Sequence, residues 1–100
     1  MGLSRAGRIV TEGDTWQRVD GFVGTRVGTG TVILDLEAGR YYSFEDAALV
    51  IWDLLEGPQT LAGIVENLTA GYDVTRDQCQ TDVAKFIDRL MQKSLVRLVG

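Results

Sequence analysis

Nucleophilic chemistry in this sequence would depend on Cys79, the one cysteine among 100 residues. A thiol becomes a catalytic nucleophile when a neighbouring base or cation lowers its pKa, and the chain contains no histidine. Cys79 falls in the first turns of a predicted helix, where the helix N-terminus lowers a thiol pKa somewhat. One cysteine without histidine cannot build a tetrahedral zinc site or an intrachain disulfide. We therefore expect a structural cysteine, no catalytic residue and no metal site.

Paired acidic side chains are the other groups that could do chemistry. Asp35 and Glu37 lie two positions apart on a predicted strand and so point to one face, and Asp53 and Glu56 share a flank of a predicted helix. An acid–base pair needs surroundings that shift a pKa toward the working pH. No neighbouring pattern indicates burial, so we expect solvated surface carboxylates.

The segment Gly28-Thr29-Gly30 resembles a fragment of a phosphate-binding loop. The full motif also needs Gly-Lys-Ser/Thr and a following helix, and here the flanking runs FVGTRV and TVILDLE are typical of strands. Glycine tolerates positive φ at little cost. The segment therefore predicts a tight hairpin turn.

Length, composition and charge limit the class of protein. With 100 residues, of which 45% are apolar, the chain can form one domain with its own core. Residues 31–100 contain six Lys or Arg against eleven Asp or Glu, which disfavours phosphate contacts and hence a nucleic-acid partner. No run approaches the roughly 20 apolar residues of a membrane helix, and the start lacks a secretion signal. We expect a cytoplasmic protein with neither a membrane nor a nucleic-acid partner.

Three strands are predicted after an N-terminal arm. Residues 1–21 show no clean period and are interpreted as an arm that is flexible or loosely docked, or that pairs as a strand. Strand-like runs follow at 22–27, 31–37 and 40–44, joined by short turns. Such an order favours an antiparallel meander with its third strand at an edge.

Three helices are predicted next. The first follows Glu45-Asp46 directly and ends at Gly57-Pro58, because glycine is favoured just past a helix and proline cannot continue one. Thr60 is the expected N-cap of the second, and Thr75 with Gln78 forms a capping box for the third, which runs to about Lys93. The tail LVRLV adds a short strand or an extension. The fold class is therefore α+β: a winged-helix-like domain with a three-stranded antiparallel sheet followed by three helices.

An edge strand at Arg40–Phe44 is the candidate binding feature. Neighbouring strand residues point to opposite faces, so Tyr42 and Phe44 share one face and Tyr41 and Ser43 the other. An edge with unpaired N–H and C=O groups accepts an added strand from an extended peptide. A protected edge without a binding role is the alternative that the residues alone leave open.

The same segments resemble the PqqD-like family, whose members recognise ribosomally made peptides that undergo modification. The resemblance covers about Phe22 to Val96. It depends on the runs VILDL, GRYYSF, AA with IWDLLEG, and DV with FI and L in the third helix. The sequence departs from the family at Phe44-Glu45, where Leu-Asn is usual, and at Ser94, where glycine is common. The loss of the Asn leaves Asp46 as the candidate helix cap.

The resemblance implies a site and a partner. Residues 22–100 would form a recognition domain that binds the leader segment of a precursor peptide, as an added strand along the third strand and against the third helix. No cofactor is implied. The implied peptide-binding residues are Arg40, Tyr41, Tyr42, Ser43, Phe44, Asp82, Val83, Phe86 and Leu90.

The resemblance also implies a role in a pathway. The first hypothesis is a non-catalytic recognition element and peptide chaperone of lasso-peptide biosynthesis, which delivers the leader to a leader peptidase (a cysteine protease) and a cyclase. The second is a chaperone of pyrroloquinoline quinone biosynthesis that works with a radical SAM enzyme. A winged-helix DNA-binding regulator is a third hypothesis, which the acids of the third helix (Asp77, Asp82, Asp88) disfavour.

Overall fold

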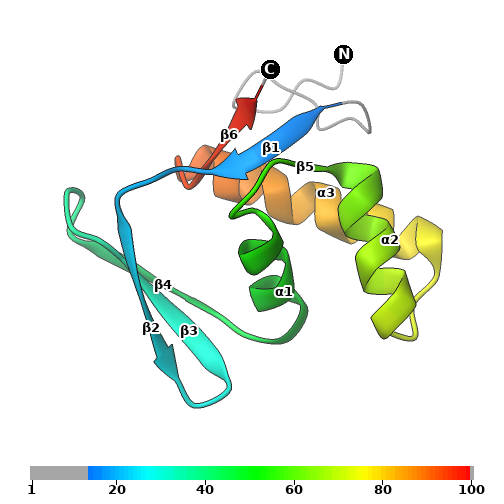
Figure 1. Cartoon of the computed structure of the whole chain (residues 1–100), viewed down its shortest axis with the longest axis horizontal. Coiled ribbons are helices and arrows are strands. Elements are labelled where there is room, and N and C mark those ends of the chain that lie inside the picture. The colour runs from blue at the N-terminus through cyan, green and yellow to red at the C-terminus, as the bar shows by residue number, and fades with distance from the viewer. Residues whose placement is uncertain (1–13, 100) are drawn as a thin grey trace.

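The computed structural model describes residues 14–99, which form two small antiparallel sheets and three helices (Figure 1). One sheet has the strand order β2-β3-β4 and the other β5-β1-β6. In Figure 1 the β2-β3-β4 sheet extends to the left, whereas α2 and α3 lie to the right. The elements in chain order are β1 (Thr15–Arg18), β2 (Phe22–Val27), β3 (Gly30–Asp35), β4 (Arg40–Phe44), α1 (Asp46–Leu54), β5 (Gln59–Thr60), α2 (Leu61–Gly71), α3 (Arg76–Gln92) and β6 (Val96–Val99).

The predicted meander is confirmed as the β2-β3-β4 sheet. Val27 pairs with Gly30, so β2 and β3 are joined by a two-residue turn in which Gly28 has φ +61°, as hairpin turns of this length require. Between β3 and β4, Gly39 has φ +69° and its N–H donates to the Asp35 carbonyl at 2.9 Å. Among residues 14–99, β4 pairs with β3 alone and is therefore an edge strand, as the sequence predicts.

The second sheet includes part of the expected N-terminal arm, which there takes the alternative of pairing as a strand. β1 is its central strand, pairing with β5 on one side and β6 on the other, and Trp16 is fully buried. Residues 15–18 of the expected arm therefore pack with the rest of the described chain, whereas residues 1–13 lie outside the described residues. Four residues are too few to show a period, and their partners lie far along the chain, so the sequence pattern carries no sign of this pairing. The tail does form a strand, β6.

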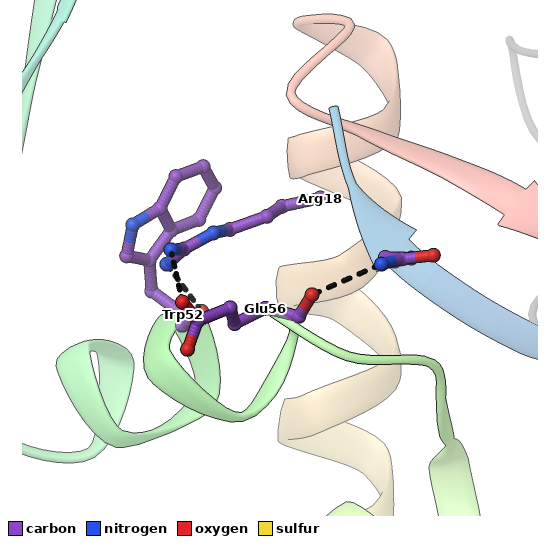
Figure 2. Close-up of polar contacts among 4 residues, drawn as sticks. Arg18, Trp52 and Glu56 are labelled. Carbon is purple, nitrogen blue, oxygen red and sulfur yellow. Dashed lines mark hydrogen bonds and ion pairs between the residues drawn. The ribbon is translucent and has the colours of Figure 1, made fainter. Parts of the chain in front are cut away.

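Arg18 connects the end of β1 to α1 through contacts with Trp52 (Figure 2). Its Nη1 donates to the Trp52 carbonyl oxygen at 3.2 Å, and its guanidinium carbon lies 5.1 Å from the centre of the Trp52 ring. Glu56 adds an ion pair at 3.8 Å, and its carbonyl oxygen accepts from Gln17 Nε2 at 3.0 Å. The backbone N–H of Arg18 also donates to the Leu55 carbonyl. These contacts hold the end of β1 directly against α1 and the residues that follow it.

Two of the three predicted capping residues, Thr60 and Thr75, are confirmed, but the Gln78 side chain does not complete the capping box and donates instead to Asp82 Oδ1 at 2.9 Å. The Thr60 hydroxyl accepts from the Gly63 N–H at 3.0 Å, and the Thr75 hydroxyl accepts from the Gln78 N–H at 3.2 Å. The predicted Asp46 cap is wrong. Asp46 is already the first helical residue, with φ +53°, and the N-cap residue Glu45 makes no side-chain capping bond. Glu45 is the one residue between β4 and α1, so the N-terminus of α1 has a capping position but no side-chain cap.

One hydrophobic core joins all three helices to both sheets. It includes Trp16 from β1, Ile33 and Phe44 from the other sheet, and Trp52, Ile64 and Ile87 from the helices. The expected α+β class, with a three-stranded antiparallel sheet followed by three helices, is confirmed, and the β5-β1-β6 sheet is added to it.

Candidate functional site

Within the described part of the chain, the outer edge of β4 carries backbone groups of two residues that no neighbouring strand bonds. Because Val27 and Gly30 flank a two-residue turn, they form a hydrogen-bonded pair, and the pairs then alternate along both ladders. On β3, this alternation directs the groups of Thr31, Ile33 and Asp35 toward β4. The N–H and C=O groups of Tyr41 and Ser43 therefore point away from the sheet, where an added strand would bond to them.

The inner face of β4 lies against α3. The ring of Phe44 meets the ring of Phe86 edge-on with centroids 5.8 Å apart, and Lys93 Nζ lies 5.8 Å from the centre of the Tyr42 ring. Phe86 thus contacts the last residue of β4, and Lys93, two helical turns later, contacts Tyr42, which lies two residues earlier on that strand. The surface formed by these four side chains, Tyr42, Phe44, Phe86 and Lys93, is called the β4–α3 trough below.

A cavity of about 410 Å³ lies at the N-terminal half of α3. Phe86 lines this cavity and also contacts Phe44, so it belongs to both the cavity and the trough. Most of its lining is apolar and comes from α1, α2, the α2–α3 connection and α3, including Ala48, Ile51, Leu68, Val74, Val83 and Phe86. A cavity with such walls fits an apolar side chain.

The strand members of the predicted site lie together along β4 but differ in exposure. Tyr41 is 72% exposed and points outward with Ser43, whereas Tyr42 is half-buried and Phe44 is buried against α1 and α3. The expected split of the two faces is therefore observed. Arg40 is exposed at the start of the strand, on the same face as Tyr42.

The helix members of the predicted site separate into two groups. Asp82, Val83 and Phe86 line the cavity, although Val83 itself is only 2% exposed. Leu90 is also 2% exposed and does not line the cavity, so its role in peptide binding stays a prediction. Leu90 packs inward because it shares the core stripe of α3 with Val83 and Ile87.

Sequence reasoning missed Lys93 and the cavity walls on α1 and α2. Lys93 lies seven positions after Phe86, which is two helical turns and hence the same side of α3. That spacing could have revealed it. No local signal links Ala48 or Val74 to α3, because the packing of helices brings them together.

Cys79 lines the cavity with a thiol whose pKa is raised. Its side chain is buried, and that burial raises the pKa of the thiol, with a smaller contribution from the Asp82 carboxylate and an opposing one from Arg76. The expected lowering by the helix N-terminus is therefore outweighed. Within residues 14–99, no group of three His, Cys, Asp or Glu side chains is placed to hold a metal ion.

A comparison with protein-family models matches most of the segment that contains these elements. The family model described as "Coenzyme PQQ synthesis protein D (PqqD)" matches residues 30–96, from β3 into β6. The chain belongs to the PqqD family. The match includes both β4 and α3, so the trough of this PqqD-family protein lies entirely within the family region.

Curated relatives and solved structures agree with this family. Proteins named "PqqA binding protein" from Xanthomonas campestris pv. campestris (strain 8004) and Xanthomonas euvesicatoria pv. vesicatoria (strain 85-10) are 37% identical to the PqqD-family chain over 59 residues, which is 59% of this chain. The chain spans 64% of the length of these relatives.

Two solved structures match over more of the chain. "TbiB1 in Complex with the TbiA(beta) Leader Peptide" has a TM-score of 0.73 at 30% identity and covers 84% of this PqqD-family chain and 95% of the other. "Lasso peptide synthetase B1 complexed with the leader peptide" has a TM-score of 0.69 at 26% identity and covers 82% and 96%. Among the described residues of this PqqD-family protein, the helices are too short or too polar to cross a membrane.

Proposed function

We propose that this protein binds the leader segment of a ribosomally synthesised precursor peptide without catalysing its modification. The observation that carries the proposal is the open β4 edge backed by α3. An extended peptide would bond to the outward N–H and C=O groups of Tyr41 and Ser43. These main-chain bonds would hold any extended segment, so selectivity requires contacts with side chains.

Side-chain selection would come from the trough and the cavity. Phe86 contributes to both, and the cavity walls are mostly apolar, so an apolar leader side chain would lose its hydration there. Lys93 and Asp82, which are both exposed, lie toward opposite ends of this surface and offer charges to the ends of the peptide segment. The site therefore suits a leader that combines an apolar anchor with polar flanks.

Delivery of the leader to a leader peptidase and a cyclase in lasso-peptide biosynthesis is the pathway role we propose first. It is supported by the similarity to two B1-type proteins, which extends over more than four fifths of this chain. By holding the precursor close to those enzymes, such a protein would raise its effective concentration.

A PqqA-binding chaperone that works with a radical SAM enzyme is the second candidate. It is favoured by the names of the curated relatives, which match over a shorter segment. A DNA-binding regulator has less support, because the exposed carboxylates of Asp77 and Asp82 on α3 would repel phosphates.

Titration of fluorescent leader peptides into the purified protein tests the proposal. The probes are the TbiA(beta) leader, PqqA and the leaders of short precursor frames next to the coding region. At least one should bind with a Kd of about 1 µM or tighter. Binding of none of these peptides, together with salt-dependent binding of a DNA duplex, would replace this proposal with the regulator.

A matched pair of charge changes locates the site. Phe86→Asp should abolish binding because it places a charge between the trough and the cavity. Lys85→Asp introduces the same side chain one position earlier, at an exposed place outside the cavity lining, and should bind the leader within a few-fold of the original chain. Circular dichroism melts of both variants establish that they are folded.

A further inference from the structure

Trp52 connects the proposed binding surface to the end of β1. Its ring stacks on Phe44 with centroids 5.2 Å apart, and Phe44 in turn meets Phe86 edge-on at 5.8 Å. The Trp52 ring also meets Phe22 edge-on at 6.3 Å, and the Arg18 guanidinium carbon lies 5.1 Å from its centre. Because Trp52 is only 2% exposed and tightly packed, its ring cannot turn unless these neighbours move with it.

Arg18 holds the backbone of Trp52 as well as its ring (Figure 2). The Trp52 carbonyl lies in the last turn of α1, where a helix leaves carbonyl groups without backbone partners. The N–H of Glu56, four residues on, donates to the Asp53 carbonyl instead, and the Trp52 carbonyl accepts from Arg18 Nη1 at 3.2 Å. α1 has no basic residue in its own last turn, so the Arg18 guanidinium also supplies the positive charge that a helix C-terminus favours.

The ion pair between Arg18 and Glu56 contributes little to this arrangement. The paired atoms are 3.8 Å apart and the Glu56 side chain is 78% exposed, so water and salt screen the attraction. The bond from Arg18 to the Trp52 carbonyl is partly buried. The position of Trp52 therefore depends on the ring contact and the carbonyl bond.

Arg18 lies away from the surface that a leader would contact. It lines a cavity of about 370 Å³, together with residues of the β1–β2 connection, β2, β3 and α1. Within the described residues, this cavity shares no lining residue with the 410 Å³ cavity beside Phe86. An effect of Arg18 on leader binding must therefore pass through other residues.

We infer that Arg18 is a positioning residue of the leader site. By fixing Trp52 it fixes the ring of Phe44, and Phe44 fixes the orientation in which Phe86 faces the trough and the cavity. A surface that is fixed before binding loses less entropy when a peptide binds, so removal of the guanidinium weakens binding although no contact with the peptide is lost. The inference rests on the proposed function for the peptide, whereas the orientation of Phe86 is a property of the free protein.

Titration of the leader that binds most tightly measures the effect on affinity. Arg18→Ala should raise the Kd roughly tenfold, which is within the range of couplings carried through packed side chains. Arg18→Lys keeps a cation that can lie over the Trp52 ring and should recover part of the affinity.

Two control variants separate positioning from other effects on the same titration. Glu56→Gln removes only the exposed ion pair and should bind within about twofold of the original chain. Ile64→Val, in the buried core of α2 and outside both cavity linings, lowers stability and should also bind within about twofold. Circular dichroism melts establish a temperature at which every variant is folded.

Fluorine NMR reports on Phe86 directly. The sequence contains three phenylalanines, Phe22, Phe44 and Phe86, so labelling with 4-fluorophenylalanine gives three lines, and Phe86→Leu assigns the line of Phe86. In peptide-free Arg18→Ala this line should shift or broaden, although Trp52 and Phe44 lie between the two positions. It should not move in the two control variants, because loss of stability alone leaves the folded arrangement unchanged.

The two measurements distinguish failure of the inference from failure of the proposed function. If the original chain binds no leader, the proposed function fails and the Phe86 line alone decides whether Arg18 positions that ring. An unmoved Phe86 line in Arg18→Ala overturns the inference whatever the affinity. A moved line with an unchanged Kd refutes it as well, because the orientation of Phe86 would then not govern binding.

Discussion

The ring of Phe86 on α3 meets the ring of Phe44 on β4 edge-on, with centroids 5.8 Å apart. Phe44 in turn stacks on Trp52 of α1 at 5.2 Å, and Trp52 carries the Arg18 guanidinium on its ring. The residue that borders the proposed binding surface is therefore part of a continuous aromatic chain through the core. Such a surface is pre-organised, which reduces the entropy lost when a peptide binds.

Proline at Ser43 should abolish leader binding while the fold remains. The N–H of Ser43 points away from the sheet, so its loss removes one bond to the guest strand and none to β3. Tyr42→Pro is the matched control: its N–H points toward β3, so it should lower the unfolding free energy by about 1–3 kcal/mol. Peptide titration and urea unfolding measure the two effects. Equal stability losses in both variants would contradict the assigned direction of these groups.

Glycine at Ser94 should stabilise the protein. Ser94 has φ +61° just after α3, a conformation that favours glycine. Ser94→Gly should raise the unfolding free energy by about 0.5–1 kcal/mol with an unchanged urea m-value. Ala70→Gly, on an exposed position of α2, should lower it by up to about 1 kcal/mol. If both variants lower the unfolding free energy, the left-handed conformation of Ser94 does not strain the folded chain.

Stability should decline at alkaline pH through Cys79. Burial raises the pKa of its thiol above the value in the unfolded chain, so the unfolded state releases the proton first. The contribution of this group is thus fully present below the unfolded pKa and is lost as pH rises from about 8.5 through the folded pKa. Unfolding titrations at several pH values should show a steeper alkaline decline for the original chain than for Cys79→Ala. Parallel pH profiles would contradict the raised pKa.

Replacing Trp16 should show that β1 belongs to the domain. Trp16 is fully buried, so Trp16→Ala should cost about 3–5 kcal/mol of unfolding free energy. Its indole Nε1 is buried without a hydrogen-bond partner in the described structure, so Trp16→Phe loses only volume and should cost clearly less. Urea unfolding measures both variants. A Trp16→Ala chain as stable as the original would restore the loose arm that the sequence predicts.

Local patterns in the sequence determined most of the helices and strands. Short apolar runs with glycine turns define β2, β3 and β4, and the threonines at 60 and 75 cap the helices that follow them. These signals act between neighbours in the chain, where hydrogen bonds and periodicity are visible in the residue order. The edge position of β4 follows from the same order, because short turns join successive strands. The family resemblance pointed to the same strand and helix.

Only the tertiary structure decided which residues meet across the chain. Trp16 pairs with Leu98 in the second sheet, Phe44 meets Phe86, and Leu90 turns into the core although it lies one helical turn from Phe86. Which backbone groups of β4 and β2 face outward also depends on the observed register. Burial and strand pairing between distant segments are collective properties of packing, so no local window of the sequence contains them.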